Sequence, residues 1–428
     1  MFKVKTKNLG SFDVAVCGGG VAGAAAAIAA AREGARVVLI ERAGSLGGTL
    51  TEGFMPILHD AQNKGGIVKE LFDFLNAHDM TVARHGSPVD ESGKRIPGIM
   101  VDTEGCKIFF DEECEKAGVK LLYHSQIVAI EMEEDEIKRL LVSTDCGNYS
   151  LSAKIFIDAT GNGSIADMAG CKWECGDPHE GRPSPASMSL CTIGMPPEYN
   201  GPENEAEKTE YANMLAEHGI HFSAQQMSSR KLPSLQSWST GLNFEYDVMP
   251  DDIHSLTRAV VHGRREVFDT IEQHRRIEGY EKLWVAFTNA HIGIREGRRI
   301  FGEYRLTDED ILEGRRFEDG ICLVTFGVDV HKLKSDDTTD CGRGYRTKPY
   351  NIPYRTLIPL GVKNLMLAGR CISGDFYPHA SYRVMGNMLA TGEAGGYAAA
   401  KCIKENILPR DFDGKRARDF MIGKGYEM

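Results

Sequence analysis

The chain has 428 residues, of which 42% are hydrophobic and 26% charged, a composition typical of a soluble globular protein with about two or three domains. Its formal net charge of -11 disfavours nucleic acid and anionic membrane surfaces as partners. The eleven cysteines include no C-x-x-C pair, so we expect no metal site, and we expect free thiols in a reducing cytoplasm.

The first long apolar stretch covers residues 14–31, which are all apolar or glycine. Its length suits a membrane span or, with Lys3, Lys5 and Lys7 before it, a signal peptide. Its glycines, however, are clustered near its start, and Arg32 interrupts the apolar run before a second apolar segment. No other hydrophobic segment of spanning length occurs, so we expect no membrane association.

A β-α-β pattern explains this stretch better than a membrane span. Residues 12–18 are typical of a buried strand, residues 22–34 of an Ala-rich helix, and residues 35–41 of a second buried strand. The G-x-G-x-x-G motif between the first strand and the helix consists of Gly18, Gly20 and Gly23. In this arrangement the glycines allow a tight turn, close approach to a pyrophosphate and helix–strand packing. Glu41, at the end of the second strand, would bind a ribose diol, so the pattern predicts a dinucleotide site.

The next segment favours FAD over NAD. A Gly-rich loop with Arg42 and the pair Gly47-Gly48 follows the ribose acid, where an NAD dehydrogenase would usually begin another helix. At this point the chain resembles FAD-dependent oxidoreductases with the glutathione-reductase-like FAD fold. Residues 153–171, an apolar strand leading into Ala159-Thr160-Gly161, match the second strand-turn motif of that fold.

The C-terminal region resembles the closing motif of the same fold. A buried strand at residues 364–368 meets Gly369, and a helix is expected from about Ser381 to Lys404, with its N-terminus toward the flavin ring. The segments "IREGRRIFGEYRLTDEDI", "IPYRTLIP" and "ASYRVMGNMLATGEAGG" are similar to the family called "FAD dependent oxidoreductase", itself distantly similar to fumarate reductase flavoproteins. One departure is Arg370, because many related flavoproteins have Asp after this glycine.

The motifs and the resemblance together imply a set of residues that bind FAD non-covalently. The implied residues are Gly18, Gly20, Val21, Ala22, Gly23, Glu41, Arg42, Gly47, Gly48, Thr49, Ala159, Thr160, Gly161, Gly369, Arg370, Met385, Gly386 and Asn387. By the same resemblance, Gly386 and Asn387 would allow close backbone approach to the flavin ring.

The cofactor motifs lie at both ends of the chain, and the middle lacks them. We therefore expect an α/β fold: an FAD/NAD(P)-binding Rossmann-like three-layer domain with an inserted α+β substrate domain. The cofactor domain is predicted to be discontinuous, over residues 1–75, 100–175 and 345–428. The substrate or cap domain would cover residues 180–345.

Polar residues in two segments are the candidates for catalysis. Arg295 and Arg299 would share one face of either a helix or a strand and could bind a carboxylate, unless they form salt bridges or contact the flavin phosphates. His379 and Tyr382 precede the expected flavin-facing helix and are candidates for proton transfer. Further candidates are Arg298, His291 and Arg383, with less weight on His331 and on His59, which could in principle hold flavin covalently.

The functional prediction is an oxidoreductase that transfers a hydride between flavin N5 and a small polar metabolite, with an anionic metabolite as one alternative. The alternatives are a fumarate-reductase-like reduction of an activated C=C bond, with Arg295 or Arg299 as proton donor, and a flavin-bearing subunit that relays electrons within a complex. No second G-x-G-x-x-G occurs in a β-α-β frame, so a dedicated NAD(P)H domain is not expected. The predicted partners are a small-molecule substrate and an electron donor or acceptor, with homo-oligomers an open alternative.

Overall fold

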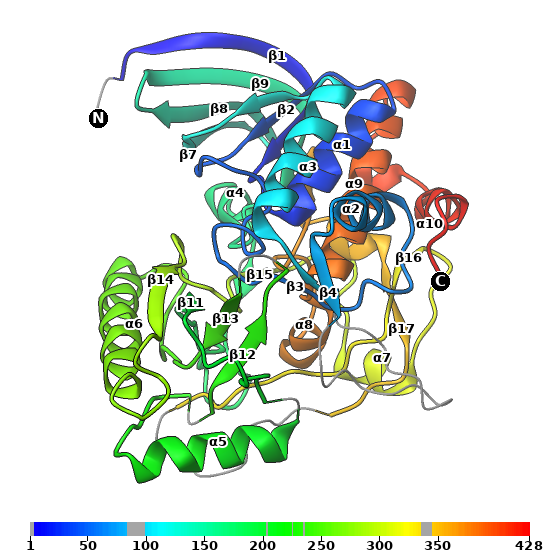
Figure 1. Ribbon diagram of the computed structural model, residues 1–428. Helices are drawn as coiled ribbons and strands as arrows, with labels where there is room; N and C mark the ends of the chain where they lie inside the picture. Colours follow the sequence, from blue (N-terminus) through cyan, green and yellow to red (C-terminus); the bar gives the residue numbers. More distant parts are fainter. Residues whose placement is uncertain (1–3, 84–98, 203, 225, 234–235, 335–344) are drawn as a thin grey trace.

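The computed structural model describes residues 4–83, 99–202, 204–224, 226–233, 236–334 and 345–428 (Figure 1). Its central sheet has seven strands, β1 (Thr6–Cys17), β2 (Val37–Ile40), β6 (Lys120–Leu122), β7 (Ser125–Glu133), β8 (Glu136–Thr144), β9 (Gly147–Asp158) and β18 (Leu365–Leu367). The order is β6-β2-β1-β9-β8-β7, and β18 also pairs with β9. The pairs formed by β6, β2, β1, β9 and β18 are parallel, whereas β8 and β7 extend the sheet in antiparallel fashion.

The register of the parallel strands brings their carboxyl ends to one edge of the sheet. Cys17 pairs with both Ile40 and Asp158, and Leu367 pairs with Asp158. The loops that follow β1, β2, β9 and β18 therefore begin side by side. Ligands of open parallel sheets bind at this edge, so the sheet positions the predicted cofactor loops together.

Helices pack beside this sheet in the upper lobe of Figure 1. They are α1 (Val21–Arg32), α2 (Gly66–Ala77), α3 (Thr103–Ala117), α9 (Met385–Glu405) and α10 (Gly414–Gly423). The contact between α1 and α9 depends on glycine: a Cβ at Gly392 would lie 2.1 Å from the carbonyl oxygen of Ala22, and one at Gly396 would lie 2.1 Å from that of Ala26. The two helices thus touch backbone to backbone, which joins the N- and C-terminal segments of the chain.

The helix expected from Ser381 to Lys404 is wrong in one respect, because the structure has two helices there. The first, α8 (Phe376–Tyr382), ends before Arg383, and α9 begins at Met385. Val384 between them is extended, with φ -70° and ψ 149°. Arg383 there donates to the backbone oxygen of Asp329, a long-range contact that helical periodicity does not encode.

The lower lobe contains an antiparallel sheet and two long helices (Figure 1). The sheet has the order β12-β13-β11-β14. Its strands are β11 (Ser189–Ile193), β12 (Ser228–Lys231), β13 (Ser237–Gly241) and β14 (Trp284–Thr288), and the helices are α5 (Glu205–Glu217) and α6 (Ile253–His274). Val267 and Ile271 of α6 pack on Leu190 and Leu242 in a core separate from that of the upper lobe.

The remaining elements are short. They are β3 (Ile57–Leu58), β4 (Thr81–Ala83), β5 (Ile99–Val101), α4 (Ser164–Met168), β10 (Trp173–Glu174), β15 (Arg299–Ile300), α7 (Asp308–Glu313), β16 (Gly320–Val324), β17 (Tyr350–Pro353) and the 3-10 helices η1 (Tyr354–Leu357) and η2 (Pro409–Asp411). The main hydrophobic cluster draws on residues 12–171 and 300–426, whereas two smaller clusters draw on residues 186–292. The fold is α/β with a Rossmann-like parallel sheet, as predicted.

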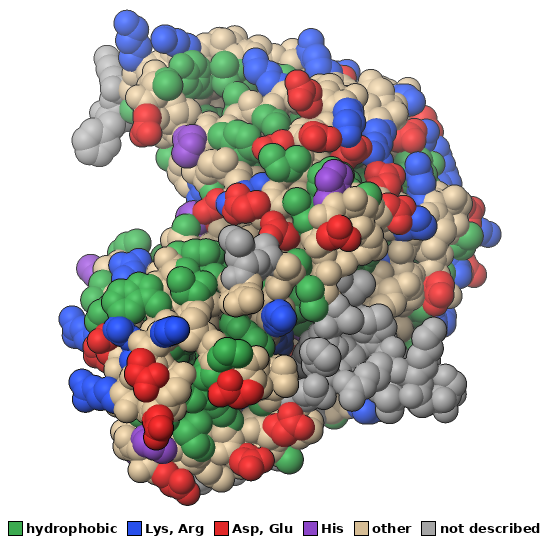
Figure 2. All heavy atoms as spheres, viewed as in Figure 1, with side chains coloured by type: hydrophobic (Ala, Val, Ile, Leu, Met, Phe, Trp, Pro, Cys, Tyr) green, Lys and Arg blue, Asp and Glu red, His purple; other side chains and the backbone are tan. Residues whose placement is uncertain are grey.

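The apolar stretch at residues 14–31 forms the end of β1, the first glycine loop and most of α1. Nearly all of its side chains are buried in the core of the upper lobe. Within the described ranges, no helix has both the length and the apolar character that a membrane crossing requires. Figure 2 shows that the surface is hollowed between the upper and lower lobes.

Candidate functional site

The three motif glycines have different local roles. A Cβ at Gly18, whose φ is +103°, would lie 2.6 Å from the carbonyl oxygen of Ala159, and one at Gly23 would lie 1.9 Å from that of Gly18. At Gly20, by contrast, no described atom lies within 4 Å of the Cβ position. Gly20 is also the N-cap of α1, and no side chain caps this helix. The backbone N–H groups of the first turn therefore face an open space suited to phosphate.

The two glycine-rich loops form one surface. The backbone N–H of Gly47 donates to the carbonyl oxygen of Gly19 at 2.8 Å, and Gly20 forms an isolated parallel bridge with Gly47. A Cβ at Gly48 would lie 2.9 Å from the Cα of Gly20. A diphosphate at the N-terminus of α1 would thus contact the backbone of both loops, because the residues that meet there are glycines.

Glu41 lies at the end of β2, beside these loops. Its Oε2 accepts from the backbone N–H of Gly19 at 2.5 Å, and its Oε1 accepts from that of Ala43 at 2.7 Å. These bonds fix the carboxylate at the edge of the loop, where a ribose would follow a diphosphate. Arg42 and Thr49 are exposed nearby in the chain.

The second and third cofactor motifs meet through Arg370. A Cβ at Gly161 would lie 2.8 Å from Cζ of Arg370, and Nη2 of Arg370 donates to Oδ1 of Asn162 at 2.9 Å. No acidic side chain among the described residues pairs with Arg370, and its Nε is buried without a partner. Burial, with smaller contributions from Arg42 and Arg383, lowers the pKa of Arg370 to about 10. A buried guanidinium without a carboxylate is suited to an anionic ligand.

The buried carboxylate of Asp158 stabilises the loop after β9. Asp158 is buried, and its carboxylate accepts from the N–H and hydroxyl of Thr160 at 3.0 and 2.7 Å and from the N–H groups of Ile165 and Ala166. Burial is the main reason why the pKa of Asp158 is raised. The hydroxyl of Thr160 therefore serves the loop itself, and the backbone of residues 159–161 is the part that faces the first glycine loop.

The N-terminus of α9 supplies the remaining motif. The backbone N–H of Gly386 donates to the carbonyl oxygen of His59, and a Cβ at Gly386 would lie 2.4 Å from the carbonyl oxygen of Asp60. Gly386 therefore makes room for the 59–60 backbone, where the sequence predicted approach to a flavin. Asn387 is buried, its Oδ1 accepts from Sγ of Cys322, and its Nδ2 has no hydrogen-bond partner in the described structure.

These features fit a flavin dinucleotide. The open space at Gly20 and the cation of Arg370 lie in loops that follow β1 and β18, whose carboxyl ends meet at one edge of the sheet. The unpartnered Nδ2 of Asn387 lies in the first turn of α9. The sequence model of the family described as "FAD dependent oxidoreductase" matches residues 13–421. The chain belongs to this family. FAD is accordingly the cofactor of this oxidoreductase.

Two solved structures share the fold over nearly the whole chain. A geranylgeranyl bacteriochlorophyll reductase-like protein from Thermoplasma acidophilum is 13% identical, with a TM-score of 0.52 over 98% of this chain and 85% of that one. The p-nitrophenol 4-monooxygenase of Pseudomonas putida DLL-E4 is 14% identical, with a TM-score of 0.51 over 97% of this chain and 88% of that one. An uncharacterized protein from the nifH2 5' region of Methanosarcina barkeri is 28% identical over 36% of this chain and 85% of its own length.

Arg295 and Arg299 of the oxidoreductase do not form the predicted pair on one face. Residues 294–298 have no regular secondary structure, and Arg299 begins β15. There Arg299 forms ion pairs with Glu296 and Glu174, the latter at 2.9 Å, and these partners raise its pKa although its burial opposes the rise. Arg295 instead donates from Nη1 to the carbonyl oxygen of Pro185 and to Oγ of Ser187, both at 2.7 Å.

His379 and Tyr382 are buried on α8. Burial, reinforced by nearby arginines, lowers the pKa of His379 well below its usual value, and its Nε2 has no partner in the described structure. The Tyr382 hydroxyl donates to the carbonyl oxygen of Ile372 at 3.0 Å, and burial raises its pKa. Tyr382 therefore holds its proton in an internal hydrogen bond, while His379 is neutral at pH 7.

The weaker candidates are distributed over the site. Arg298 pairs with Asp167 at 3.2 Å, and Nδ1 of His291 lies 3.9 Å from Oε2 of Glu52. The ring of His59 lies 5.2 Å from that of Phe326.

Sequence reasoning missed Asp329 and gave His331 little weight. Both are partly exposed, whereas Val330 between them is buried. This alternation was the available signal, since it places the two polar side chains on one side of the segment. Asp329 is an acidic partner of Arg383.

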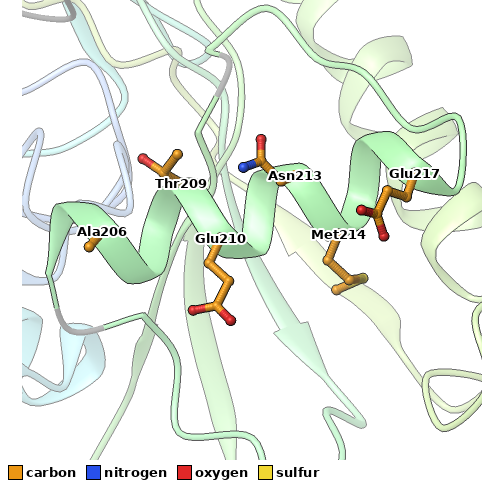
Figure 3. A pocket seen from close by; sticks show the side chains of 6 residues that line it. All are labelled: Ala206, Thr209, Glu210, Asn213, Met214 and Glu217. Atoms are coloured by element: carbon orange, nitrogen blue, oxygen red, sulfur yellow. The ribbon is translucent and has the colours of Figure 1, made fainter.

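A separate groove lies along α5, at the bottom of Figure 1. It is an open space of about 600 Å³, and all six side chains that line it come from one face of this helix (Figure 3): Ala206, Thr209, Glu210, Asn213, Met214 and Glu217. Its lining contains none of the residues assigned to the cofactor, so we assign it no part in the chemistry.

Proposed function

We propose that this oxidoreductase transfers a hydride between N5 of FAD and a small polar, anionic metabolite. The observation that carries the proposal is Arg295. It has no acidic partner among the described residues, and burial, reinforced by Arg383, lowers its pKa to about 10. Asp329 acts on both Arg295 and Arg383, and Glu296, the ion-pair partner of Arg299, acts on Arg383 as well. Arg295 itself forms no ion pair among the described residues, so an anionic substrate would balance its charge.

The residues of the chain divide into two groups in this proposal. The glycine loops, Glu41 and Arg370 hold the dinucleotide, and the positive dipole end at the N-terminus of α9 stabilises negative charge on the reduced ring. When bound, FAD supplies the hydride chemistry. Arg295 binds the anionic group of the substrate, and Phe244 supports it with its ring centroid 5.2 Å from the guanidinium carbon.

The test is an anaerobic visible spectrum of the FAD-loaded protein, before and after addition of hydroxy acids, dicarboxylates, sugars and polyols. We expect an anionic compound to bleach the flavin absorbance. Arg295→Gln should raise the KM for that compound by about 100-fold, which corresponds to about 2.7 kcal/mol of lost binding to a buried charge. The exposed Arg139, replaced in the same way, is the control. Bleaching by a neutral polyol, with no effect of Arg295→Gln, would contradict the proposal.

A second candidate is reduction of an activated C=C bond with Arg295 as proton donor. The lowered pKa of Arg295 favours it, because a guanidinium with a pKa of about 10 releases its proton more readily than an ordinary one. Arg299, the other predicted donor, is disfavoured because its ion pairs raise its pKa. Reoxidation of chemically reduced enzyme by fumarate, abolished by Arg295→Lys, would support this candidate. Failure of every such acceptor to restore the yellow colour would count against it.

A further inference from the structure

Asp329 and His331 lie beside the segment that leads into α9. Nη2 of Arg383, two residues before that helix, donates to the backbone oxygen of Asp329 at 2.8 Å and lies 3.4 Å from its Oδ2. Nε2 of His331 lies 3.6 Å from the same Oδ2. The side chains of Asp329 and His331 are 45% and 25% exposed, so both are in contact with solvent.

One aromatic ring supports both His331 and Arg295. The ring centroids of Phe244 and His331 are 4.9 Å apart, and the guanidinium carbon of Arg295 lies 5.2 Å from the Phe244 centroid. Ser187, which accepts from Arg295, donates in turn to the backbone oxygen of Asn243, so the lower lobe fixes this support. Arg295 and His331 therefore contact the same phenyl ring.

The charges around the pair determine its protonation. Burial, reinforced by Arg295 and Arg383, lowers the pKa of His331 to about 4, and Asp329 opposes this change. His331, Arg383, Arg295 and His59 all lower the pKa of Asp329, and Lys208 also acts on His331. At neutral pH the pair is a neutral imidazole beside a carboxylate, which is the state that accepts a proton and stabilises the resulting imidazolium.

On the basis of the proposed function, we propose that His331 and Asp329 form the proton-transfer pair of the substrate site and that the substrate is a small hydroxy carboxylate. Its carboxylate binds Arg295, and its hydroxyl faces His331. In oxidation the O–H bond breaks and its proton passes to the imidazole of His331. The electron pair left on oxygen forms the C=O bond as the C–H pair leaves as hydride for the cofactor. In the reverse direction the imidazolium returns the proton.

Proton uptake on binding tests this assignment without turnover. The probes are 2-hydroxyisobutyrate and 3-hydroxy-3-methylbutyrate, tertiary alcohols that bind like hydroxy acids but have no hydride to lose. An anion on Arg295 removes the charge that lowers the pKa of His331, so binding to FAD-loaded enzyme at pH 5 should take up a fraction of a proton that shrinks by pH 7.5. Calorimetry in two buffers with different ionisation enthalpies measures that fraction.

Three variants separate proton transfer from structural support. His331→Asn should bind the probe and lose the proton uptake, whereas His254→Asn, at an exposed position on α6, should keep both. Asp329→Asn should bind the probe about 10-fold more tightly, because the surroundings of Arg295 lose a negative charge. It should take up less of a proton, because the imidazolium loses its counter-charge. A purely structural role would weaken binding and uptake together.

Unchanged proton uptake in His331→Asn, or binding of neither probe, overturns the inference. Bleaching of the flavin by oxidisable hydroxy acids is measured in parallel on the wild-type protein. If an anion bleaches the flavin but proton uptake does not depend on His331, the proposed function stands and the assignment of His331 and Asp329 is wrong. Absence of bleaching by any anion removes the proposed function itself.

Discussion

At the scale of single residues, the three glycines of the G-x-G-x-x-G motif are present for different physical reasons. Gly18 and Gly23 are fixed by protein atoms, because a Cβ at either position would overlap a backbone oxygen. Gly20 is not, because the space beside it is open in the described structure. The motif therefore contains two glycines that protein packing requires and one, Gly20, that packing does not require and that we predict to face the cofactor.

This difference predicts distinct effects of two alanine substitutions. Gly20→Ala should leave the melting temperature of FAD-free protein within about 2 °C of wild type, because nothing in the protein opposes the new methyl group. It should weaken FAD binding by about 100-fold, about 2.7 kcal/mol, because the methyl occupies the expected place of the diphosphate. Calorimetry of the FAD-free protein and flavin fluorescence titration measure the two quantities.

Gly23→Ala is the matched comparison, because its Cβ would lie 1.9 Å from the carbonyl oxygen of Gly18. It should lower both the melting temperature and FAD affinity. Equal FAD affinity in Gly20→Ala and wild type would show that the diphosphate does not lie against this glycine.

At the scale of elements, the pairing of α1 with α9 connects the two ends of the chain. Gly392 and Gly396 lie one turn apart on α9, and each faces a backbone oxygen of α1. Gly395, their neighbour, has only a side-chain carbon of Leu357 at 3.5 Å from its Cβ position. A single helix thus contains glycines with opposite tolerance for a side chain.

Gly396→Ala should destabilise the protein by about 2 kcal/mol, because the added methyl forces apart two helices packed at backbone distance. Gly395→Ala should be neutral or stabilise by up to about 1 kcal/mol, because alanine favours the helix and fits the available space. Urea unfolding monitored by circular dichroism measures both changes. A destabilisation of similar size in the two variants would contradict the packing argument.

At the scale of the whole molecule, both lobes bury a neutral histidine. His274 in the core of the lower lobe has its pKa lowered to about 4, mainly by burial, and its Nε2 lies 2.9 Å from the hydroxyl of Tyr211. His379 on α8 has its pKa lowered well below its usual value, also mainly by burial. In the unfolded chain both would titrate near 6.5. Acid therefore favours the unfolded state, which takes up protons that the folded state excludes.

The free energy of unfolding should thus be fully retained above pH 6.5 and fall as the pH drops toward 4. His274 alone contributes up to about 1.4 kcal/mol for each pH unit in this window. Urea unfolding at pH 7.5, 6.0 and 5.0 should show a flatter dependence in His274→Gln than in wild type. His254→Gln, at an exposed position, should show the wild-type slope. Identical slopes in all three proteins would contradict the assignment.

Much of the cofactor site could be predicted because its information is local. A strand, a glycine turn, a helix and an acid follow one another within residues 12–41, and each leaves its own pattern of apolar and small residues. The structure places Glu41 against Gly19, and Gly20 beside the second glycine loop. The resemblance added the second and third motifs, which local pattern alone would not have distinguished from ordinary turns.

The sequence by itself therefore determined the dinucleotide-binding β-α-β unit and the α/β class, because residue spacing reflects short-range backbone geometry, and its resemblance to FAD-dependent oxidoreductases added the cofactor and the family. Only the tertiary structure decided which arginine is neutralised and which is not. Glu174 and Glu296 pair with Arg299, while Arg295 lies 5.2 Å from the Phe244 ring centroid and forms no ion pair with any carboxylate that the structure describes. Likewise, Asp329 and His331 acquire a role only through contacts with residues 54 and 87 positions away in the chain. The packing of helices and strands determines side-chain partners at such separations. The periodicity of apolar residues along the sequence does not predict that packing.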